Sequence, residues 1–179
     1  MSNEITRLKP FKHVPSIERS TWYKGILSTL LATDDDTGGA FDLVLSNMRS
    51  GTEPPPHVHA HEHEFFYVLD GKLDAYVGNN VFHLGPGECA FLPVGTPHAF
   101  IIRSPEIRML VLITPGGFMK CVASMAAPAE KLEIPSDSVT YATADLEETM
   151  KKFLKYGVRF LSPEEIANEM PVFSSRSAG

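Results

Sequence analysis

Short apolar segments separated by Gly and Pro dominate the middle of this 179-residue chain. The segments are rich in Val, Phe, Leu and Tyr, and turn residues recur between them at intervals of about 8 to 12 residues, as is typical of an all-β sandwich or barrel. This pattern predicts strands at 24–32, 40–48, 57–60, 64–69, 72–77, 80–84, 88–93, 98–103 and 109–114.

Three turn segments refine this prediction. Asp70-Gly71 and the segment 78–80 supply residues that tolerate a positive φ, which tight hairpins require, so we expect two hairpins in tandem. The acidic segment 33–39 could be interpreted as a calcium loop, but it lacks the complete ligand spacing and the closing Glu. We interpret it as a solvated turn.

The pattern changes after residue 114. The segment 118–127 is small and apolar, and a helical period follows at Leu146, Met150, Phe153 and Leu154. The segment 162–165 then has the form of a capping box with Pro at the first helical position. We predict short C-terminal helices packed on the barrel, with binding of a partner by the amphipathic helix as the alternative.

The chain therefore divides into three parts without an internal repeat. These are an N-terminal arm (1–21), one β-barrel (22–118) and a helical extension packed on the barrel (119–179). A length of 179 residues suits one domain with modest additions.

Composition and charge exclude several classes of function. The formal net charge is −6 and no segment concentrates Lys or Arg, so nucleic acid is not an expected partner. No apolar run has the length of about 20 residues that a membrane span needs, and the N-terminus lacks the apolar core of a secretory signal. Cys89 and Cys121 are expected to be free, buried thiols, and we expect a cytoplasmic protein.

A cluster of metal-ligand residue types begins at His57. Because side chains alternate along a strand, His57 and His59 project to one side. Glu64 follows His59 by an odd number of residues, so the chain must turn between them, at 60–63, for Glu64 to join the imidazoles. His98 opens another strand and can supply a fourth ligand from across the barrel.

Three imidazoles and one carboxylate suit one divalent transition metal, and Fe, Ni, Cu, Mn, Co and Zn all remain open. A structural zinc site is the alternative, although such sites favour Cys-rich, closed tetrahedra. His61 and His63 continue the alternation of His57 and His59, but after the predicted turn they become exposed loop residues. His13 and His83 have no partner by spacing and are interpreted as ordinary histidines.

Two spaced motifs carry a resemblance to a known family. Gly51-x5-His57-x-His59-x4-Glu64-x6-Gly71 resembles the first cupin motif, and Gly87-x5-Pro93-x-Gly95-x2-His98 resembles the second. Further segments, among them 54–59, 65–69 and 114–118, are similar to small monocupins related to quercetin dioxygenases. The resemblance implies an all-β cupin fold, that is, a double-stranded β-helix or jelly-roll barrel, with short C-terminal helices here.

The same resemblance implies a metal-dependent dioxygenase that cleaves a quercetin-like flavonol, or a similar enolisable aromatic, with O2 and releases carbon monoxide. It implies that Glu64 acts as both base and metal ligand, beside His57, His59 and His98. Two alternatives remain open. They are a cupin that binds a small ligand without turnover, and a cupin isomerase or decarboxylase.

Strand parity provides an independent argument about the ligand. The residues that share the inward face with the predicted ligands are Phe66, Val68, Phe100 and Ile102, which favours a small aromatic substrate. The same residues could equally be ordinary barrel core. An isomerase or decarboxylase of a polar acid would need a cation near His98, and parity directs the nearby Arg103 outward.

Two expectations concern the barrel surface. The segment 118–127 is a candidate lid over the barrel mouth. Cupin barrels commonly cover an edge strand by pairing two subunits, so we expect a homodimer with 24–32 as the candidate edge.

Overall fold

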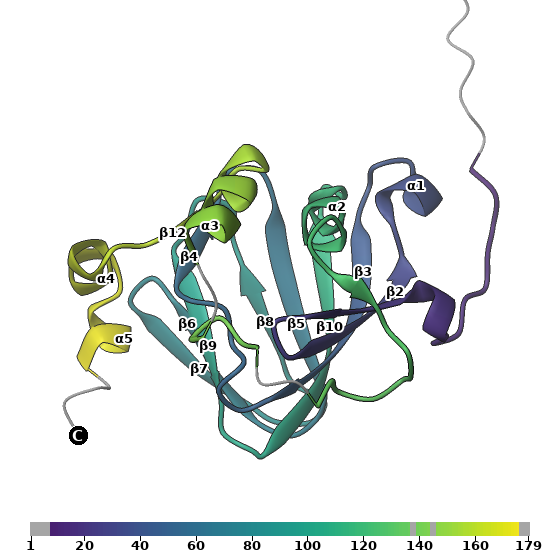
Figure 1. Ribbon diagram of the computed structural model, residues 1–179. Coiled ribbons are helices and arrows are strands. Elements are labelled where there is room, and N and C mark those ends of the chain that lie inside the picture. The colour runs from purple at the N-terminus through teal and green to yellow at the C-terminus, as the bar shows by residue number, and fades with distance from the viewer. Residues whose placement is uncertain (1–7, 137–138, 144–145, 176–179) are drawn as a thin grey trace, which may run out of the picture.

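Two antiparallel sheets form the body of the protein, which we describe from a computed structural model (Figure 1). The structure describes residues 8–136, 139–143 and 146–175; the start of the predicted arm (1–7), Asp145 and the last four residues lie outside this part. The larger sheet has the order β11 (Ala127–Pro128), β1 (Ser20–Tyr23), β2 (Ile26–Ala32), β3 (Asp42–Arg49), β10 (Glu106–Thr114), β5 (His63–Asp70) and β8 (Cys89–Leu92).

The smaller sheet faces the larger one, and the two diverge toward the end that carries α2 and α3 (Figure 1). Its order is β12 (Val158–Phe160), β4 (His57–His59), β9 (His98–Ile102), β6 (Leu73–Val77) and β7 (Asn80–Leu84). Inward-facing residues of both sheets, such as Val68 and Leu73, form one continuous hydrophobic core. The predicted all-β architecture is confirmed.

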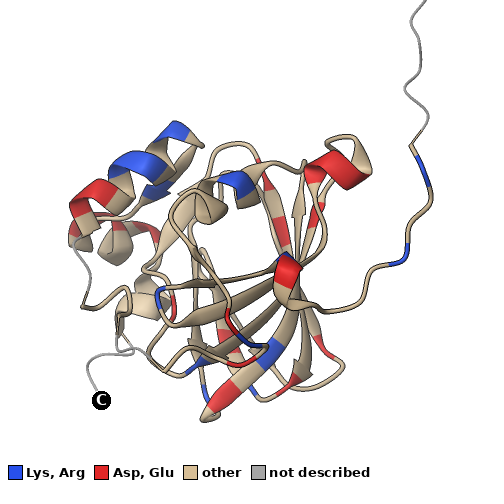
Figure 2. Ribbon diagram, turned by 45° about the vertical axis from the view of Figure 1, so that its right-hand side comes forward, with Lys and Arg blue, Asp and Glu red and all other residues tan. Residues whose placement is uncertain are grey.

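The helices are short and peripheral. They are η1 (Ile17–Arg19), α1 (Asp34–Thr37), α2 (Phe118–Ala123), α3 (Leu146–Lys155), α4 (Pro163–Glu169) and α5 (Pro171–Ser175). Among the described residues, no helix combines the length and the apolar character needed to cross a membrane. Lys and Arg are distributed over the elements and do not form one basic stripe (Figure 2).

The strand predicted at 24–32 is present as β2, but the prediction that it lies at an edge of the sheet is wrong. The chain turns at Lys24-Gly25, where both residues have a positive φ, and β1 pairs with β2 as a hairpin. β2 is also paired with β3, so it lies inside the sheet and is not the edge strand that was expected to pair with a second subunit. The pattern missed β1 because a strand of four residues is too short for alternation to be visible.

Of the two predicted hairpins, one is confirmed. β6 and β7 pair in register from Val77↔Asn80, across the turn at Gly78. Asp70-Gly71 instead carries the chain from β5 in one sheet to β6 in the other. Gly71 has a φ of 85°, and a Cβ there would lie 2.5 Å from the carbonyl oxygen of Glu106, so only glycine fits this crossing.

The acidic segment 33–39 is a single helical turn rather than an open, solvated turn. Thr33 caps α1 by accepting from the backbone N–H of Asp36, whose carboxylate accepts in return from the backbone N–H of Thr33. This reciprocal arrangement is a capping box and explains why the segment is helical. Lys120 of α2 forms an ion pair with Asp35 at 3.0 Å and also pairs with Asp34, which ties α2 to α1.

The C-terminal helices follow the prediction in part. α4 begins with the expected capping box, in which Ser162 and Glu165 exchange hydrogen bonds. α3 buries Phe153, but Met150 and Leu154 are 42% and 61% exposed, so they do not belong to its packed face. Leu146 packs against the core beside Phe153, so only part of the apolar stripe of α3 is covered.

The two cysteines differ in environment. Both thiols are free, as predicted, and Cys121 is fully buried. Cys89 is exposed, which corrects the expectation of burial. The reason is alternation in β8, where Ala90 and Leu92 occupy the inward positions and Cys89 faces out.

Candidate metal centre

Four side chains from both sheets converge at the end of the core nearest α2. His57 and His59 lie on β4 and His98 lies opposite His57 on β9, whereas Glu64 comes from β5 of the larger sheet. The turn that parity required between His59 and Glu64 is present, because β4 ends at His59 and β5 begins four residues later. One potential ligand atom from each of the four residues lies within 4.8 Å of all the others, and all four residues are buried.

The Nδ1 atoms of the three imidazoles point away from this convergence point and are held by acceptors. His57 Nδ1 lies 2.8 Å from the carbonyl oxygen of Pro55, and His98 Nδ1 lies 3.0 Å from that of Thr96. A carbonyl oxygen can only accept, so both Nδ1 atoms carry the proton. His59 Nδ1 lies 3.1 Å from a carboxylate oxygen of Glu62.

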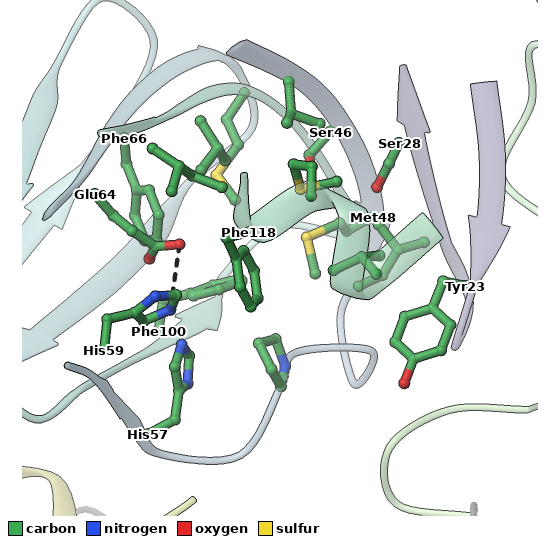
Figure 3. A pocket seen from close by; sticks show the side chains of 18 of the residues that line it. Tyr23, Ser28, Ser46, Met48, His57, His59, Glu64, Phe66, Phe100 and Phe118 are labelled. Carbon is green, nitrogen blue, oxygen red and sulfur yellow. Dashed lines mark ion pairs between the residues drawn. The ribbon is translucent and has the colours of Figure 1, made fainter. Parts of the chain in front are cut away.

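The opposite nitrogens therefore present lone pairs to one another. The Nε2 atoms of His57 and His98 are 3.1 Å apart, and a Glu64 oxygen lies 3.3 Å from His98 Nε2. The other Glu64 oxygen lies 3.7 Å from His59 Nε2 (Figure 3). His59 Nε2 is buried and has no hydrogen-bond partner within the described part of the chain. Converging lone pairs and a carboxylate in a buried space fit a divalent cation, so the cluster could hold a metal ion.

The pKa values of the metal-free cluster reflect its burial and its mutual charges. Burial, together with His98 and His59, lowers the pKa of His57 to about 3, so this imidazole is neutral at physiological pH. Burial lowers the pKa of His59, but Glu64 and Glu62 outweigh it and the net shift is upward. Burial raises the pKa of Glu64, but His59 and His98 outweigh it and bring the pKa to about 2.

Glu62 is a buried carboxylate, although the sequence pattern predicted only that it belongs to a short polar turn. It orients His59 from behind, in the arrangement by which a carboxylate fixes the tautomer of a metal-ligating imidazole. Its spacing of three residues from His59 could have signalled it, but the sequence does not show which turn residue faces inward. His61 is exposed, as expected.

His63 differs from the prediction that placed it in an exposed loop. It is the first residue of β5, is partly buried, and accepts a hydrogen bond on Nδ1 from the backbone N–H of Val94 at 3.0 Å. Its ring also lies against Phe91, with centroids 5.3 Å apart. Strand parity directs it to the face opposite Glu64, away from the candidate metal centre.

A pocket opens beside the four residues and extends between the sheets (Figure 3). The space open to the centres of water-sized spheres is about 110 Å³, compared with roughly 10–15 Å³ for a single water. Its walls are mainly apolar and include Val44, Met48, Phe66, Phe100, Met109, Val111, Ile113, Phe118, Met119, Val122, Phe153 and Phe160. The pocket has room for an organic ligand next to the candidate metal centre.

Of the four predicted substrate contacts, two line the pocket and two lie in the hydrophobic core beyond it. Phe66 and Phe100 line the pocket and pack edge to face with ring centroids 5.5 Å apart. Val68 and Ile102 lie on the same inward faces but belong to the hydrophobic core and are not among the lining residues. Val68 and Ile102 each lie two residues beyond Phe66 and Phe100 on the same strand. A rise of two residues moves a side chain about 6.6 Å along the strand, which places Val68 and Ile102 in the core beyond the pocket.

Helix α2 places aromatic side chains over the candidate metal centre. Phe118, its first residue, packs edge to face on His59 with ring centroids 4.8 Å apart and also contacts Phe153 of α3. Met119 and Val122 line the same wall of the pocket. The backbone N–H groups of Gly117 and Met119 donate to the buried carboxylate of Asp42, which anchors the start of the helix.

Cationic side chains lie outside the pocket. None of the residues that line the pocket is a Lys or Arg. Arg103 faces outward, as parity predicted, and pairs with Asp74 at 2.7 Å. His83 binds the same carboxylate from the other side, and His13 Nδ1 lies 3.0 Å from the carbonyl oxygen of Leu31.

Comparison with known proteins identifies the family. A family model described as "Cupin domain" matches residues 44–115, which contain all four convergent residues. "Polyketide synthase CurC" of Streptomyces cyaneus is 30% identical over 105 residues, which cover 57% of this chain and 67% of that protein. The chain belongs to the cupin superfamily. This confirms the resemblance carried by the two motifs and the cupin fold that it implied.

A further relative of this cupin is "Quercetin 2,3-dioxygenase" of Bacillus subtilis (strain 168), which is 31% identical over 109 residues. That alignment covers 61% of this chain but only 32% of the relative, so the cupin spans about a third of its length. Among solved structures, KdgF from Halomonas sp. has 21% identity and a TM-score of 0.48 and covers 53% of this chain and 83% of its own.

Proposed function

We propose that this cupin is a metal-dependent dioxygenase that acts on a flavonol or a similar enolisable aromatic compound. The observation that carries the proposal is the position of a buried three-histidine, one-glutamate cluster at the wall of an apolar, largely aromatic pocket without Lys or Arg. Such a pocket suits an uncharged aromatic ring better than the sugar phosphate or small acid of an isomerase or decarboxylase. The relation to a quercetin dioxygenase supports the same substrate class.

His57, His59, Glu64 and His98 would hold one divalent metal, for which Fe, Ni, Cu, Mn, Co and Zn remain candidates. When bound, the metal would supply Lewis-acid stabilisation of a hydroxyl–carbonyl edge of the substrate and the centre that the chemistry of O2 requires.

Glu64 is the base in this proposal, and its surroundings support the role. It is ionised at neutral pH and therefore able to accept the proton of the substrate hydroxyl. Its low pKa in the metal-free chain depends on charge at the imidazoles, whereas its burial raises the pKa.

The remaining pocket residues position the ring and exclude water. Phe66 and Phe100 offer an edge-to-face pair against which an aromatic ring can stack. Phe118 covers His59 from α2, and the ion pairs of Lys120 with α1 hold that helix over the pocket. Exclusion of water strengthens electrostatic interactions at the reacting atoms and protects reactive intermediates.

The test is aerobic incubation of metal-loaded protein with quercetin, with O2 uptake and carbon monoxide both measured. We expect consumption of O2 and flavonol in equal amounts, and a loss of about 100-fold or more in kcat for Glu64→Gln, because its neutral amide cannot accept the proton. Glu164→Gln, on the exposed first turn of α4, is the matched control and should keep wild-type activity. If quercetin binds and is recovered unchanged from metal-loaded wild-type protein, the chain is a binding cupin instead.

A further inference from the structure

Two serine hydroxyls interrupt the apolar wall of the pocket far from the candidate metal centre. Ser28 on β2 and Ser46 on β3 are among the lining residues, and each is directly opposite the other across the two strands. The other lining residues of these two strands are Ile26, Val44 and Met48, all of them apolar. Figure 3 shows both hydroxyls at the end of the pocket away from His57 and Glu64.

Ser28 and Ser46 are buried residues whose hydroxyls face the pocket without a partner in the described part of the chain. Ser28 and Ser46 are 6% and 7% exposed, and neither side chain makes a hydrogen bond to any other described residue. Other buried hydroxyls of the chain are satisfied: Ser20 and Thr29 bind each other at 2.7 Å, and Thr52 donates to the carbonyl oxygen of Arg49. Because their oxygens face the pocket and no described residue satisfies them, both hydroxyls are free to bind a ligand that enters it.

The sheet register gives the separation between the two ends. Ile113 of β10 lies opposite Glu64 on one side and Asp42 of β3 on the other, and Ser46 is four residues farther along β3. On a flat sheet, two strand spacings and a rise of four residues place Ser46 and Glu64 about 16 Å apart between Cα atoms. Both side chains project into the pocket, so a ligand of two or three fused or linked rings spans the space between them.

The chemistry of this end defines the group it would bind. A serine hydroxyl both donates and accepts, so a facing pair of them suits a group that also does both, such as a phenolic hydroxyl. An anionic group is disfavoured because no Lys or Arg lines the pocket. The hydroxyls lie among apolar walls, where a polar group left unpaired carries a large penalty and therefore gives strong discrimination.

We propose that Ser28 and Ser46 form a hydroxyl-recognition subsite that selects aromatic ligands bearing a neutral hydrogen-bonding substituent at the end remote from the metal. The inference rests on the proposed function for the location of the chelating end. It adds that the preferred substrate carries polar groups at both ends, and that these two serines fix its orientation and depth.

The test compares two flavonols that share the chelating hydroxyl–carbonyl edge. Quercetin carries further hydroxyls on its other rings, and 3-hydroxyflavone carries none. Dissociation constants are measured anaerobically with metal-loaded wild-type protein and with the double variant Ser28→Ala/Ser46→Ala. We expect the double variant to bind quercetin at least about tenfold more weakly, since it loses two neutral hydrogen bonds, and to bind 3-hydroxyflavone within about twofold of wild type.

Controls separate recognition from folding. Ser20→Ala removes a buried hydroxyl on the strand next to β2 that is already paired within the protein, and it should leave the preference for quercetin unchanged. Metal content and melting temperature of the double variant should match wild type, because alanine fits where serine was unpaired.

Each outcome addresses one proposal or both. If the double variant binds quercetin as tightly as wild type does, the two hydroxyls hold only water and the inference is overturned. If wild type prefers quercetin through these serines but consumes no O2, the dioxygenase proposal fails and the subsite stands. If neither flavonol binds metal-loaded wild type, both proposals are overturned.

Discussion

Glu62 offers the sharpest test of how the candidate metal centre is held together. Its carboxylate lies 3.1 Å from His59 Nδ1 and its side chain is 9% exposed, so water is a poor substitute for it. Carboxylates in this position behind a metal-ligating histidine typically contribute 10- to 100-fold to metal affinity. Glu62→Gln keeps an acceptor oxygen but loses the charge, so we expect about tenfold weaker metal binding, or about 1.4 kcal/mol.

Glu62→Ala removes the acceptor altogether and leaves His59 free to rotate or change tautomer. We expect a loss of about 100-fold in this case. The measurement is a competition titration of metal-free protein with Zn²⁺ or Ni²⁺ against a chromogenic chelator, with Glu164→Gln as the control for a charge change at an exposed site. Metal affinity of Glu62→Ala within twofold of wild type would refute the orienting role.

Three further predictions concern stability and the pocket wall. Phe118→Ala should lower the free energy of unfolding by about 3–4 kcal/mol in urea titrations, because it removes a buried ring packed on His59. Gly71→Ala should destabilise by more than Gly87→Ala, since both have a φ near 85° but only at Gly71 does the new Cβ meet the backbone; equal losses would contradict this. Burial raises the pKa of Asp74, but hydrogen bonds from His83 and Arg103 outweigh it and the net shift is downward, so Asp74→Asn should cost about 1 kcal/mol at pH 7. That difference should vanish as the pH falls through the folded pKa of Asp74, where the wild-type carboxyl becomes protonated; a constant difference down to pH 2 would exclude the ion pair as its source.

Strand parity predicted from the sequence which way several side chains of the candidate metal centre and its pocket point. The shared face of His57 and His59, the break before Glu64 and the inward direction of Phe66 and Phe100 all follow from the two-residue period of a strand. The outward direction of Arg103 follows in the same way, and its pairing with Asp74 is consistent with it. These are local properties, and they hold whichever strands become neighbours.

Partnerships between distant segments could not be predicted in this way. The turn at Gly71 has the local chemistry of a hairpin, yet the chain crosses there to the other sheet. β5 pairs with β8 and β10 instead of with β6. Likewise β2 pairs with β1, and the apolar stripe of α3 is only partly used, since Leu146 and Phe153 pack on the core while Met150 and Leu154 are exposed. Pairing is decided by contacts far apart in sequence, which local periodicity does not encode.

The sequence by itself therefore determined the all-β class, the two cupin motifs and the residue types that could bind a metal. Only the tertiary structure brought β4 and β9 of one sheet against β5 of the other, so that four side chains face one point. It also turned Glu62 toward His59 and placed Ser28 beside Ser46 in the same pocket. The physical reason is that alternation fixes the direction of a side chain, whereas its neighbours depend on how the two sheets pack.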